Sequence, residues 1–443
     1  MRTRSRMVTS GQAIALGATA LAGVCLSAGN ARAAAQTYAI TINSTARTDS
    51  SKCTLRGAIE AINTKKAVGK CQAGGGSASS PDIILINGGL VFSLSSQLDI
   101  KSSMILRSTS TSSMVVFKQS GSPLILVNAV TFPSAGTSKI TFEDIDFEGT
   151  LPGSTLGIYA EGKDPDSITF NRCWIQGFGF GGIHSKDTSL IINSSGVNKN
   201  SHSESTGAGV FIEGNNGNTT ISIFNSSITN NFDASGACNG GGVFLELNGA
   251  IASIVNSTIS DNKGGSGLAL YNPESNMSAN TLKITGSTIY GNSTLNAGCS
   301  TGAGVDNPCV LDGSGVCHYF NVTLDGTVID ANSGDFGETS EYTGPVTIKD
   351  SLLGSSDNAT VTFVGSHNVT DFQTSGLDPV LRDNGVTGQK RRQTHKPLAG
   401  SLCINFLPSI DFGSQVSNKD ERGRTRGALG GFDVGAVELQ SGE

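Results

Sequence analysis

A seven-residue unit that recurs along the chain restricts the fold more than any other feature. Residues 225–231 read Asn-Ser-Ser-Ile-Thr-Asn-Asn, residues 256–262 read Asn-Ser-Thr-Ile-Ser-Asp-Asn, and residues 286–292 read Gly-Ser-Thr-Ile-Tyr-Gly-Asn. Alignment of the unit along the chain gives as its first residue Asp144, Asn171, Asn193, Asn225, Asn256, Gly286, Asp325 and Asp350. Three places later stand Phe147, Trp174, Gly196, Ile228, Ile259, Ile289, Val328 and Leu353. This self-similarity, at intervals of roughly 30 residues, indicates a stacked repeat.

A second, glycine-rich column lies between the copies of this unit. It comprises residues 181–183, 207–210, 240–243, 265–268 and 302–305. The segments between the turns, such as 220–224 and 282–285, are short, β-branched and roughly alternating, as strands are. The chain holds 58 Gly, and only 15% of its residues are charged, which is unlike a helical repeat. A β-propeller needs a repeat of about 40 residues, longer than most intervals here.

We therefore predict an all-β fold, a right-handed parallel β-helix (solenoid) with a short N-terminal capping helix. In this fold the recurring Ile lines the interior and the Asn at the turn passes amide hydrogen bonds from coil to coil. Gly at the other corner supplies positive φ. The capping helix is predicted over 54–64, where Leu55, Ala58, Ile59 and Ile62 share one face. Thr54 is its expected N-cap, although Gly57 denies it the Glu of a capping box.

The first 35 residues have the pattern of a secretory signal peptide. Arg2, Arg4 and Arg6 precede an apolar stretch, and Ala31-Arg32-Ala33 resembles a cleavage site. No later stretch is long and apolar enough to span a bilayer. The formal net charge of −6 disfavours nucleic acid as a partner. We expect a monomer that is extracellular or at the cell surface, with the periplasm as the alternative.

Cysteine usage agrees with export. Without Cys25 eight Cys remain, and an even number in an exported chain indicates disulfides. We predict a Cys53–Cys71 pair and name Cys309–Cys317 as a second, local pair. The sequence leaves the other four unassigned. The chain has no Cys-x-x-Cys motif, so metal binding through Cys is not expected.

Two end motifs resemble a known family. Residues 53–59, followed by Asn63-Thr64 and Cys71, resemble the Cys-Ser-Leu-Arg-Glu-Ala motif near the N-terminus of bacterial secreted β-helix proteins. Residues 420–426 and 433–438 resemble the C-terminal signature of the choice-of-anchor Q group, as do 377–379, 383–385 and 394–395. The resemblance implies a signal peptide at 1–35, an N-terminal cap at 36–80, pectin lyase-like β-helix repeats at 81–376 and a C-terminal cap at 377–443. The basic run 389–392 departs from the family pattern and is predicted to be an exposed loop.

Proteins with this fold include polysaccharide lyases and hydrolases, so acidic groups on the outer face are the candidates for chemistry. In the run 143–148, Asp144 is assigned to the turn. Weak candidates for a Ca²⁺ site are Glu143, Asp146 and Glu148. A weak catalytic alternative combines Asp146, Asp164, Asp166 and His184, the last of which alternates outward from Ile183.

No established catalytic motif is present. Trp174 is assigned to core packing and His395 to a structural hydrogen bond. We predict a secreted, non-catalytic, adhesin-like protein that binds an extracellular glycan or surface protein without a cofactor. The alternative is a polysaccharide lyase or glycoside hydrolase. A groove with three or more convergent carboxylates on the outer face of the coils near 143–184 would favour the enzyme.

Overall fold

The structure is a computed structural model of the full chain. It describes residues 37–40, 51–119, 127–131, 138–150, 155–162, 166–203, 207–214, 219–235, 240–273, 280–295, 303–308, 310–311, 317–337, 346–354, 361–384, 392–407, 418–427 and 430–443. Residues Ala34–Glu443 form one compact unit, separate from Met1–Ala33. The predicted signal peptide and its cleavage site lie outside the described residues.

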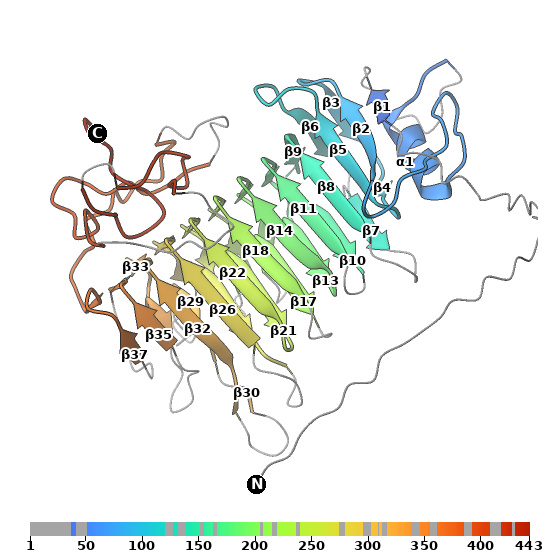
Figure 1. Ribbon diagram of the computed structural model, residues 1–443. Coiled ribbons are helices and arrows are strands. Elements are labelled where there is room, and N and C mark those ends of the chain that lie inside the picture. Colours follow the sequence, from blue (N-terminus) through green and yellow to red (C-terminus); the bar gives the residue numbers. More distant parts are fainter. Residues whose placement is uncertain are drawn as a thin grey trace, which may run out of the picture. The chain divides into compact units, whose positions relative to one another are not determined.

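Three parallel sheets carry the fold, and most coils of the chain add one strand to each sheet in turn (Figure 1). The twelve-stranded sheet comprises β1 (Thr37–Ile40), β2 (Asp82–Ile86), β5 (Met104–Ser108), β8 (Lys139–Glu143), β11 (Ser167–Asn171), β14 (Ser189–Asn193), β18 (Thr220–Phe224), β22 (Ile251–Val255), β26 (Asn280–Thr285), β32 (Phe320–Asp325), β35 (Val346–Lys349) and β37 (Val361–Val364). The eleven-stranded sheet comprises β3 (Val91–Leu94), β6 (Val115–Gln119), β9 (Ile145–Glu148), β12 (Trp174–Gln176), β15 (Gly196–Asn198), β19 (Ser227–Thr229), β23 (Thr258–Ser260), β27 (Thr288–Tyr290), β33 (Val328–Asp330), β36 (Leu352–Leu353) and β38 (Val369–Thr370).

The nine-stranded sheet comprises β4 (Leu98–Asp99), β7 (Val127–Thr131), β10 (Ile158–Glu161), β13 (Ile183–Lys186), β17 (Val210–Gly214), β21 (Val243–Leu247), β25 (Leu268–Tyr271), β29 (Val305–Asp306) and β34 (Phe336–Gly337). A small sheet joins β16 (Ser201–His202), β20 (Phe232–Asp233), β24 (Lys263–Gly264) and β28 (Ser293–Thr294). An antiparallel pair joins β30 (Val310–Leu311) and β31 (Cys317–His318). The predicted right-handed parallel β-helix is confirmed.

Alternation along the strands builds the interior. In β11, Ile168 and Phe170 are buried, while Ser167, Thr169 and Asn171 are partly exposed. Phe142 and Phe170, on neighbouring coils, stack with their ring centroids 5.4 Å apart. Parallel pairing at a spacing of about 4.8 Å repeats such contacts from coil to coil. One continuous apolar core results.

The first position of the repeat unit turns the chain through a left-handed backbone. The φ angle is between +49° and +61° at Asp144, Arg172, Ser194, Asn225, Asn256, Gly286, Gly326 and Asp350. Asn, Asp and Gly reach this region at least cost, which explains why they recur there. The side chain of the next residue, as in Ser226, Ser257 and Ser287, accepts a backbone N–H from the preceding coil at 3.1–3.2 Å.

Strand pairing corrects the sequence alignment by one residue at three coils. The first positions predicted at Asn171, Asn193 and Asp325 are wrong, and they fall instead on Arg172, Ser194 and Gly326. The inward residues of these coils are consequently Ile175, Val197 and Ile329. Trp174, Gly196 and Val328 therefore belong to the outward column.

The amide ladder was predicted at the first position of the unit. It lies mainly at the last position. The Nδ2 of each Asn donates to the Oδ1 of the next at 2.8–3.0 Å through Asn200, Asn231, Asn262, Asn292 and Asn332. At the first position, Asn256 donates to Asn225 at 2.6 Å. Buried amides that satisfy one another in this way hold the corner of each coil.

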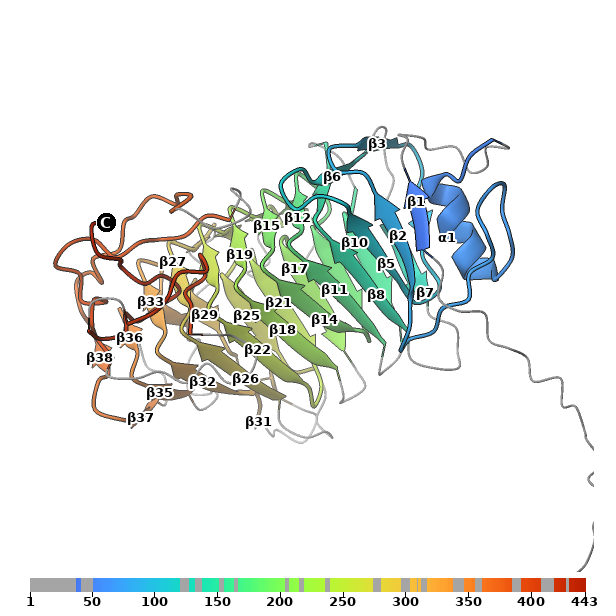
Figure 2. The ribbon, with the colours of Figure 1, turned by 45° about the horizontal axis from the view of Figure 1, so that its top comes forward.

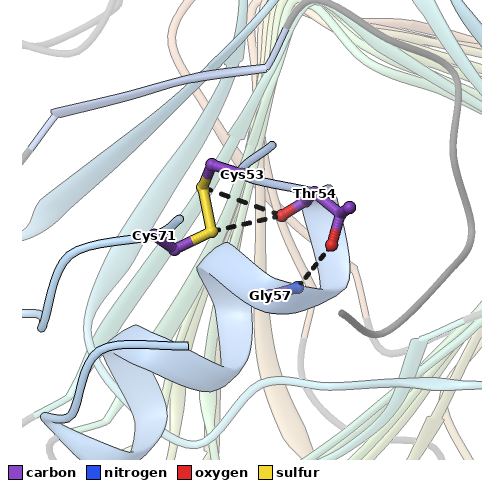
Figure 3. The surroundings of a disulfide bond; sticks show 4 residues. All are labelled: Cys53, Thr54, Gly57 and Cys71. Atoms are coloured by element: carbon purple, nitrogen blue, oxygen red, sulfur yellow. Dashed lines mark hydrogen bonds between the residues drawn. A yellow bond between two sulfur atoms is a disulfide. The ribbon is translucent and has the colours of Figure 1, made fainter. Parts of the chain in front are cut away.

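A helix closes the first coil. The predicted helix is confirmed as α1 (Leu55–Thr64), and the Thr54 hydroxyl accepts the Gly57 N–H at 3.0 Å (Figure 3). The predicted disulfide Cys53–Cys71 is also confirmed (Figure 3). Cys173 and Cys403 are free and buried. Cys309 and the side chain of Cys317 lie outside the described part, so that pairing stays a prediction.

The described residues of the C-terminal segment, 377–384, 392–407, 418–427 and 430–443, pack along the side of the stack, over the outer face of the eleven-stranded sheet (Figure 2). Thr258 in β23 donates to the Glu421 carboxylate at 2.6 Å. The Ala436 N–H donates to Thr288 in β27 at 2.9 Å. Val328 and Leu352 of the same column share an apolar cluster with Leu377, Cys403, Leu407 and Val434. The segment therefore supports the four neighbouring strands β23, β27, β33 and β36 laterally.

Candidate functional site

The acidic run 143–148 does not form one site. Glu143 ends β8 in the twelve-stranded sheet and accepts a hydrogen bond from Arg107. Asp144 turns the chain and receives both hydrogen bonds of the Arg172 guanidinium at 2.8 Å. The pKa of Arg172 is raised, first by this hydrogen bond to Asp144. Asp144 therefore serves the turn, as predicted.

Asp146 and Glu148 lie on a different sheet from Glu143. Both point outward from β9 in the eleven-stranded sheet, where Asp146 is fully buried. Glu148 accepts a hydrogen bond from Gln176 at 3.4 Å. The predicted Ca²⁺ candidates are thus divided between two sheets. Within the described ranges, no group of three or more His, Cys, Asp or Glu side chains is arranged to hold a metal ion.

The predicted catalytic set is also dispersed. Asp164 lies outside the described residues. Asp166 is buried and accepts the Ser138 N–H at 2.6 Å, a contact that links two coils. Asp146 belongs to the eleven-stranded sheet and His184 to the nine-stranded sheet. The structure therefore separates His184 from the acids with which the sequence grouped it.

Trp174 is buried, but on the outward side of its strand. Its side chain lies over Gly196 of the next coil, where a Cβ atom would come within 1.7 Å of the indole ring. The ring is only 5% exposed. The assignment to an inward position was wrong, while the preference for packing over an exposed stacking platform agrees with this burial.

The outer face of the nine-stranded sheet brings polar and aromatic side chains together. Along each strand the inward residues, such as Ile183 and Val210, alternate with two outward residues. The first outward positions form the ring row, Tyr159, His184, Phe211 and Phe244. The second outward positions form the charged row, Glu161, Lys186, Glu213 and Glu246. Neighbours in each row are one strand apart, about 4.8 Å.

The rings of the ring row are in continuous contact. Tyr159 meets His184 edge to face with ring centroids 4.9 Å apart, and His184 lies 4.5 Å from Phe211. Phe211 and Phe244 are nearly parallel at 5.3 Å. Both Phe rings are buried, whereas Tyr159 and His184 are partly accessible. A ligand on this face would therefore meet the Tyr159 and His184 end of the row.

The charged row couples to the rings. Lys186 Nζ lies 3.1 Å from a carboxylate oxygen of Glu213, and His184 Nε2 lies 3.7 Å from the other. The Tyr159 hydroxyl donates to Glu161 at 3.1 Å. All four side chains of the charged row are partly accessible. The face thus offers three carboxylates and one ammonium in a line.

Burial shifts the protonation of several of these groups. It lowers the pKa of His184 to about 4, with further lowering by Lys186 and His202, so the ring is neutral at pH 7. Burial and the Glu161 carboxylate raise the pKa of Tyr159 to about 12. The hydrogen bond to Glu213 raises the pKa of Lys186. Burial and the nearby Glu213 raise the pKa of Glu246.

A cavity of about 170 Å³ adjoins this face. It is lined by Leu156, Phe180, Ile183, His184, His202, Gly207 and Phe211. The Nε2 atom of His184 is buried and has no hydrogen-bond partner within the described residues. His184 thus stands between the cavity and the charged row. A larger cavity of about 510 Å³ lies between α1 and β4, where Arg56 and Asn63 are already bonded to backbone groups.

Sequence reasoning found His184 but missed the other residues of this site. Tyr159, Lys186 and Glu213 come from three different coils, and no local motif joins them. The signal was available in the glycine column, whose predicted alignment is confirmed by the pairing of Ile183, Val210, Val243, Leu268 and Val305. The residues one and three places after Ile183, Val210 and Val243 belong to the two rows.

Comparison with known proteins adds little beyond the fold. No family model matches the chain, and no curated protein is similar to it. Among solved structures, the chain is similar to the crystal structure of the pectate lyase Pel9A, with a TM-score of 0.47 and 14% sequence identity. The alignment covers 93% of this chain and 98% of that chain. No helix in the described part of the chain is long and apolar enough to cross a membrane. The strand pairing identifies the fold of this chain as a parallel β-helix.

Proposed function

We propose that the protein acts outside the cytoplasm as a non-catalytic, adhesin-like β-helix that binds a glycan on the outer face of its nine-stranded sheet. The supporting observation is the accessible pairing of Tyr159 and His184 with the charged row. Rings with polar edges and a few fixed charged groups are the usual means of orienting a polar ligand. The Cys53–Cys71 disulfide supports an oxidising compartment. The proposal includes no cofactor. We also propose that the chain belongs to the family that its two end motifs resemble.

The charges of the row favour an uncharged glycan. Three carboxylates and one ammonium give this face a net negative charge, which repels acidic polymers. Lys186 is paired with Glu213 and its raised pKa keeps it protonated, so it is a poor general base. His184, with a pKa of about 4, is also a weak base at neutral pH. These features favour binding over catalysis.

Binding of the full secreted chain to immobilised neutral, amino-bearing and acidic glycans tests the proposal. We expect binding to neutral glycans that weakens by about tenfold in Tyr159→Ala and in Glu213→Ala, because each removes a direct contact. Lys283→Ala, on the twelve-stranded sheet, is the matched control and should bind as the wild type does. Failure to bind any glycan, or equal binding by all variants, would refute the proposal. If the chain bound a surface protein and no glycan, the ligand would be a protein and the proposed ligand class would be wrong.

A second candidate is a glycoside hydrolase, and one observation favours it. Glu213 and Glu246 are paired neighbours, one strand spacing of about 4.8 Å apart, and retaining glycosidases hold their two carboxyl groups about 5–5.5 Å apart. The raised pKa of Glu246 suits an acid beside the Lys186-bound Glu213. New reducing ends from a neutral polysaccharide, absent with Glu246→Gln, would establish this activity. Unsaturated products would establish a lyase. If a broad panel of polysaccharides gave neither kind of product, both activities would be excluded.

A further inference from the structure

We infer that the bound glycan is an extended, β-1,4-linked chain that lies along the stack of coils, with Tyr159 at one end of its path and Tyr271 at the other. The inference rests on the proposed function and adds the length, the linkage and the direction of the glycan. It also assigns a ligand contact to Tyr271, which follows the charged row by one strand. Its basis is the regular spacing of accessible side chains along the nine-stranded sheet.

Tyr271 ends β25 and occupies the position that the charged row has on the preceding strands. It pairs in register with Glu246, and its side chain is partly accessible. Ala269 takes the place of the ring row on this strand, so Tyr271 is the ring that β25 presents outward. Its ring centroid lies 6.5 Å from that of Phe244. This stretch of the face therefore carries a partly accessible tyrosine at each end, Tyr159 on β10 and Tyr271 on β25.

The two tyrosines are too far apart for a single sugar to contact both. The strands β10, β13, β17, β21 and β25 are consecutive neighbours in the sheet. Four steps of about 4.8 Å therefore place Tyr159 and Tyr271 about 19 Å apart along the stack. Lys186, Glu213 and Glu246 lie between them, one on each intervening strand, and all three are partly accessible. A glycan that contacts both tyrosines thus lies along the stack and crosses five strands.

The spacing of the strands favours one type of linkage. In an extended β-1,4-linked chain, each sugar residue is about as long as one strand spacing. Successive sugars can therefore meet equivalent positions on successive strands, where carboxylate oxygens accept hydrogen bonds from their hydroxyl groups. The apolar face of a sugar ring can lie against the apolar body of a tyrosine ring at each end. An α-1,4-linked chain of the same sugar curves, so it leaves this line after a few residues.

Oligosaccharides of graded length test this inference by calorimetry with the full secreted chain. The ligands are β-1,4-linked oligomers of glucose, mannose and N-acetylglucosamine, and α-1,4-linked oligomers of glucose, each from dimer to hexamer. All are uncharged, and the two glucose series differ only in linkage. We expect the affinity of at least one β-1,4-linked series to rise about tenfold from trimer to pentamer through added hydrogen bonds. It should then level off, because the fifth sugar reaches the last strand of the path. The α-1,4-linked hexamer should bind about tenfold more weakly than the best β-1,4-linked hexamer.

Tyr271→Ala is the decisive variant. We expect it to weaken pentamer binding about fivefold, to the affinity of the tetramer, because the fifth sugar loses its aromatic contact. Its affinity for the tetramer should stay within about twofold of the wild type, since Tyr159 still holds the other end. Tyr271→Phe keeps the ring and should restore pentamer binding. Phe224→Ala removes a partly accessible outward ring from the twelve-stranded sheet and is the matched control, which should bind as the wild type does.

Several outcomes would overturn the inference and leave the proposed function intact. One is an affinity that no longer rises beyond the dimer, and another is equal binding of the α-1,4-linked and the best β-1,4-linked hexamer. Unchanged pentamer binding in Tyr271→Ala would also overturn it, as would binding to other neutral glycans but to none of these β-1,4-linked series. Failure to bind any glycan would overturn the proposed function itself.

Discussion

The two ends of the β-helix are completed in different ways. At the N-terminal end, α1 places Leu55, Ile59 and Ile62 against the interior of the first coil. Arg56 donates to the carbonyl oxygens of Ser96 and Gln97 beside the edge strand β4. Asn63 donates to the Asp99 carbonyl at 2.6 Å and accepts the Lys101 N–H at 2.8 Å. Side chains of one helix thus replace the backbone partners of a missing strand.

Among the described residues, none forms a comparable cover over the last coil. Phe363 in β37 pairs with Ile348 and continues its inward column, but Phe363 is 51% exposed. Val364 and Val369 of the same coil are exposed as well. The chain that follows runs back along the eleven-stranded sheet, as Figure 2 shows for the red segment beside β27 and β33.

The N-terminal helix and the C-terminal segment also differ in the kind of side chain that they bury. The α1 cover is chiefly apolar, whereas the C-terminal segment buries charged side chains. Arg422 is fully buried, donates to Asp420 at 2.7 Å and to Glu443 at 3.0 Å, and also bonds to the Glu438 carbonyl. Arg426 donates to Asn256 of the repeat at 2.6 Å. The residues of the C-terminal signature therefore hold this segment on the side of the stack.

Among the predicted effects on stability, the largest should come from breaking the buried ion pairs of Arg422 in the C-terminal segment. We expect Arg422→Met to destabilise the C-terminal segment by about 3–5 kcal/mol, because it leaves the Asp420 carboxylate buried without its cation. Denaturant unfolding combined with amide exchange in 418–427 and 430–438 would measure this. Arg382→Met is the control, since its ion pair with Asp378 is exposed and should contribute less than about 1 kcal/mol. Equal effects of the two substitutions would contradict the assignment.

Truncating one apolar residue at each end compares the covers directly. Ile62→Ala should cost about 2–5 kcal/mol, because the side chain is fully buried beneath α1. Phe363→Ala should cost about 1 kcal/mol, because half of its ring already meets solvent. Unfolding midpoints of the two variants decide the comparison. A cost at Phe363 as large as that at Ile62 would mean that the last coil is covered in solution.

The disulfide should act on the N-terminal end alone. Removing the Cys53–Cys71 bond, which closes a segment with a sequence separation of 18, should cost about 3 kcal/mol by freeing the unfolded chain. The double variant Cys53→Ser/Cys71→Ser should accelerate amide exchange in α1 and leave exchange in 418–427 unchanged. Unaltered exchange in α1 would show that the helix cover does not depend on this bond.

Much of the fold follows from patterns that are local in sequence. Alternation within strands, the recurring Ile and the glycine column predicted the β-helix, and the apolar face of 55–62 predicted α1. At Asp325 the error arose because Asp325 and Gly326 are both typical turn residues, and Gly326 occupies the left-handed position. At Asn171 and Asn193 the errors arose because Arg172 and Ser194 occupy it. Neither is a residue type that marks such turns, and only coil-to-coil pairing reveals them.

The site and the C-terminal segment were less predictable, for a physical reason. The site is assembled from residues of neighbouring coils that are distant in sequence. The C-terminal segment depends on contacts with residues much further away in sequence, such as that of Arg426 with Asn256 and that of His395 with Ser260 at 2.6 Å. The structural hydrogen bonds predicted for His395 are confirmed. The basic run 389–392 was predicted to be exposed, and for Arg392 this is wrong. Arg392 is buried and bonds to carbonyl oxygens of Asn225 and Glu421, which no local pattern indicates.

A pH dependence is expected in the C-terminal cover alone. Burial raises the pKa of Glu421 to about 8, although Arg392 and Arg426 act to lower it. Between the ordinary value near 4.5 and about 8, the folded protein holds a proton that the unfolded chain releases. This contribution to stability is therefore complete below the lower value and is lost as the pH rises through about 8.

Glu421→Gln should remove that slope while keeping an oxygen to accept the Thr258 hydroxyl. We expect wild type and variant to be alike near pH 4 and the variant to be the more stable of the two near pH 9, where the wild type has lost the contribution of this proton. Amide exchange in 418–427 measured across this range gives the profile, and exchange in α1 is the internal reference. Parallel profiles for the two proteins would show that Glu421 does not titrate on unfolding, and the contrast between a charged and an apolar cover would then rest on Arg422 alone.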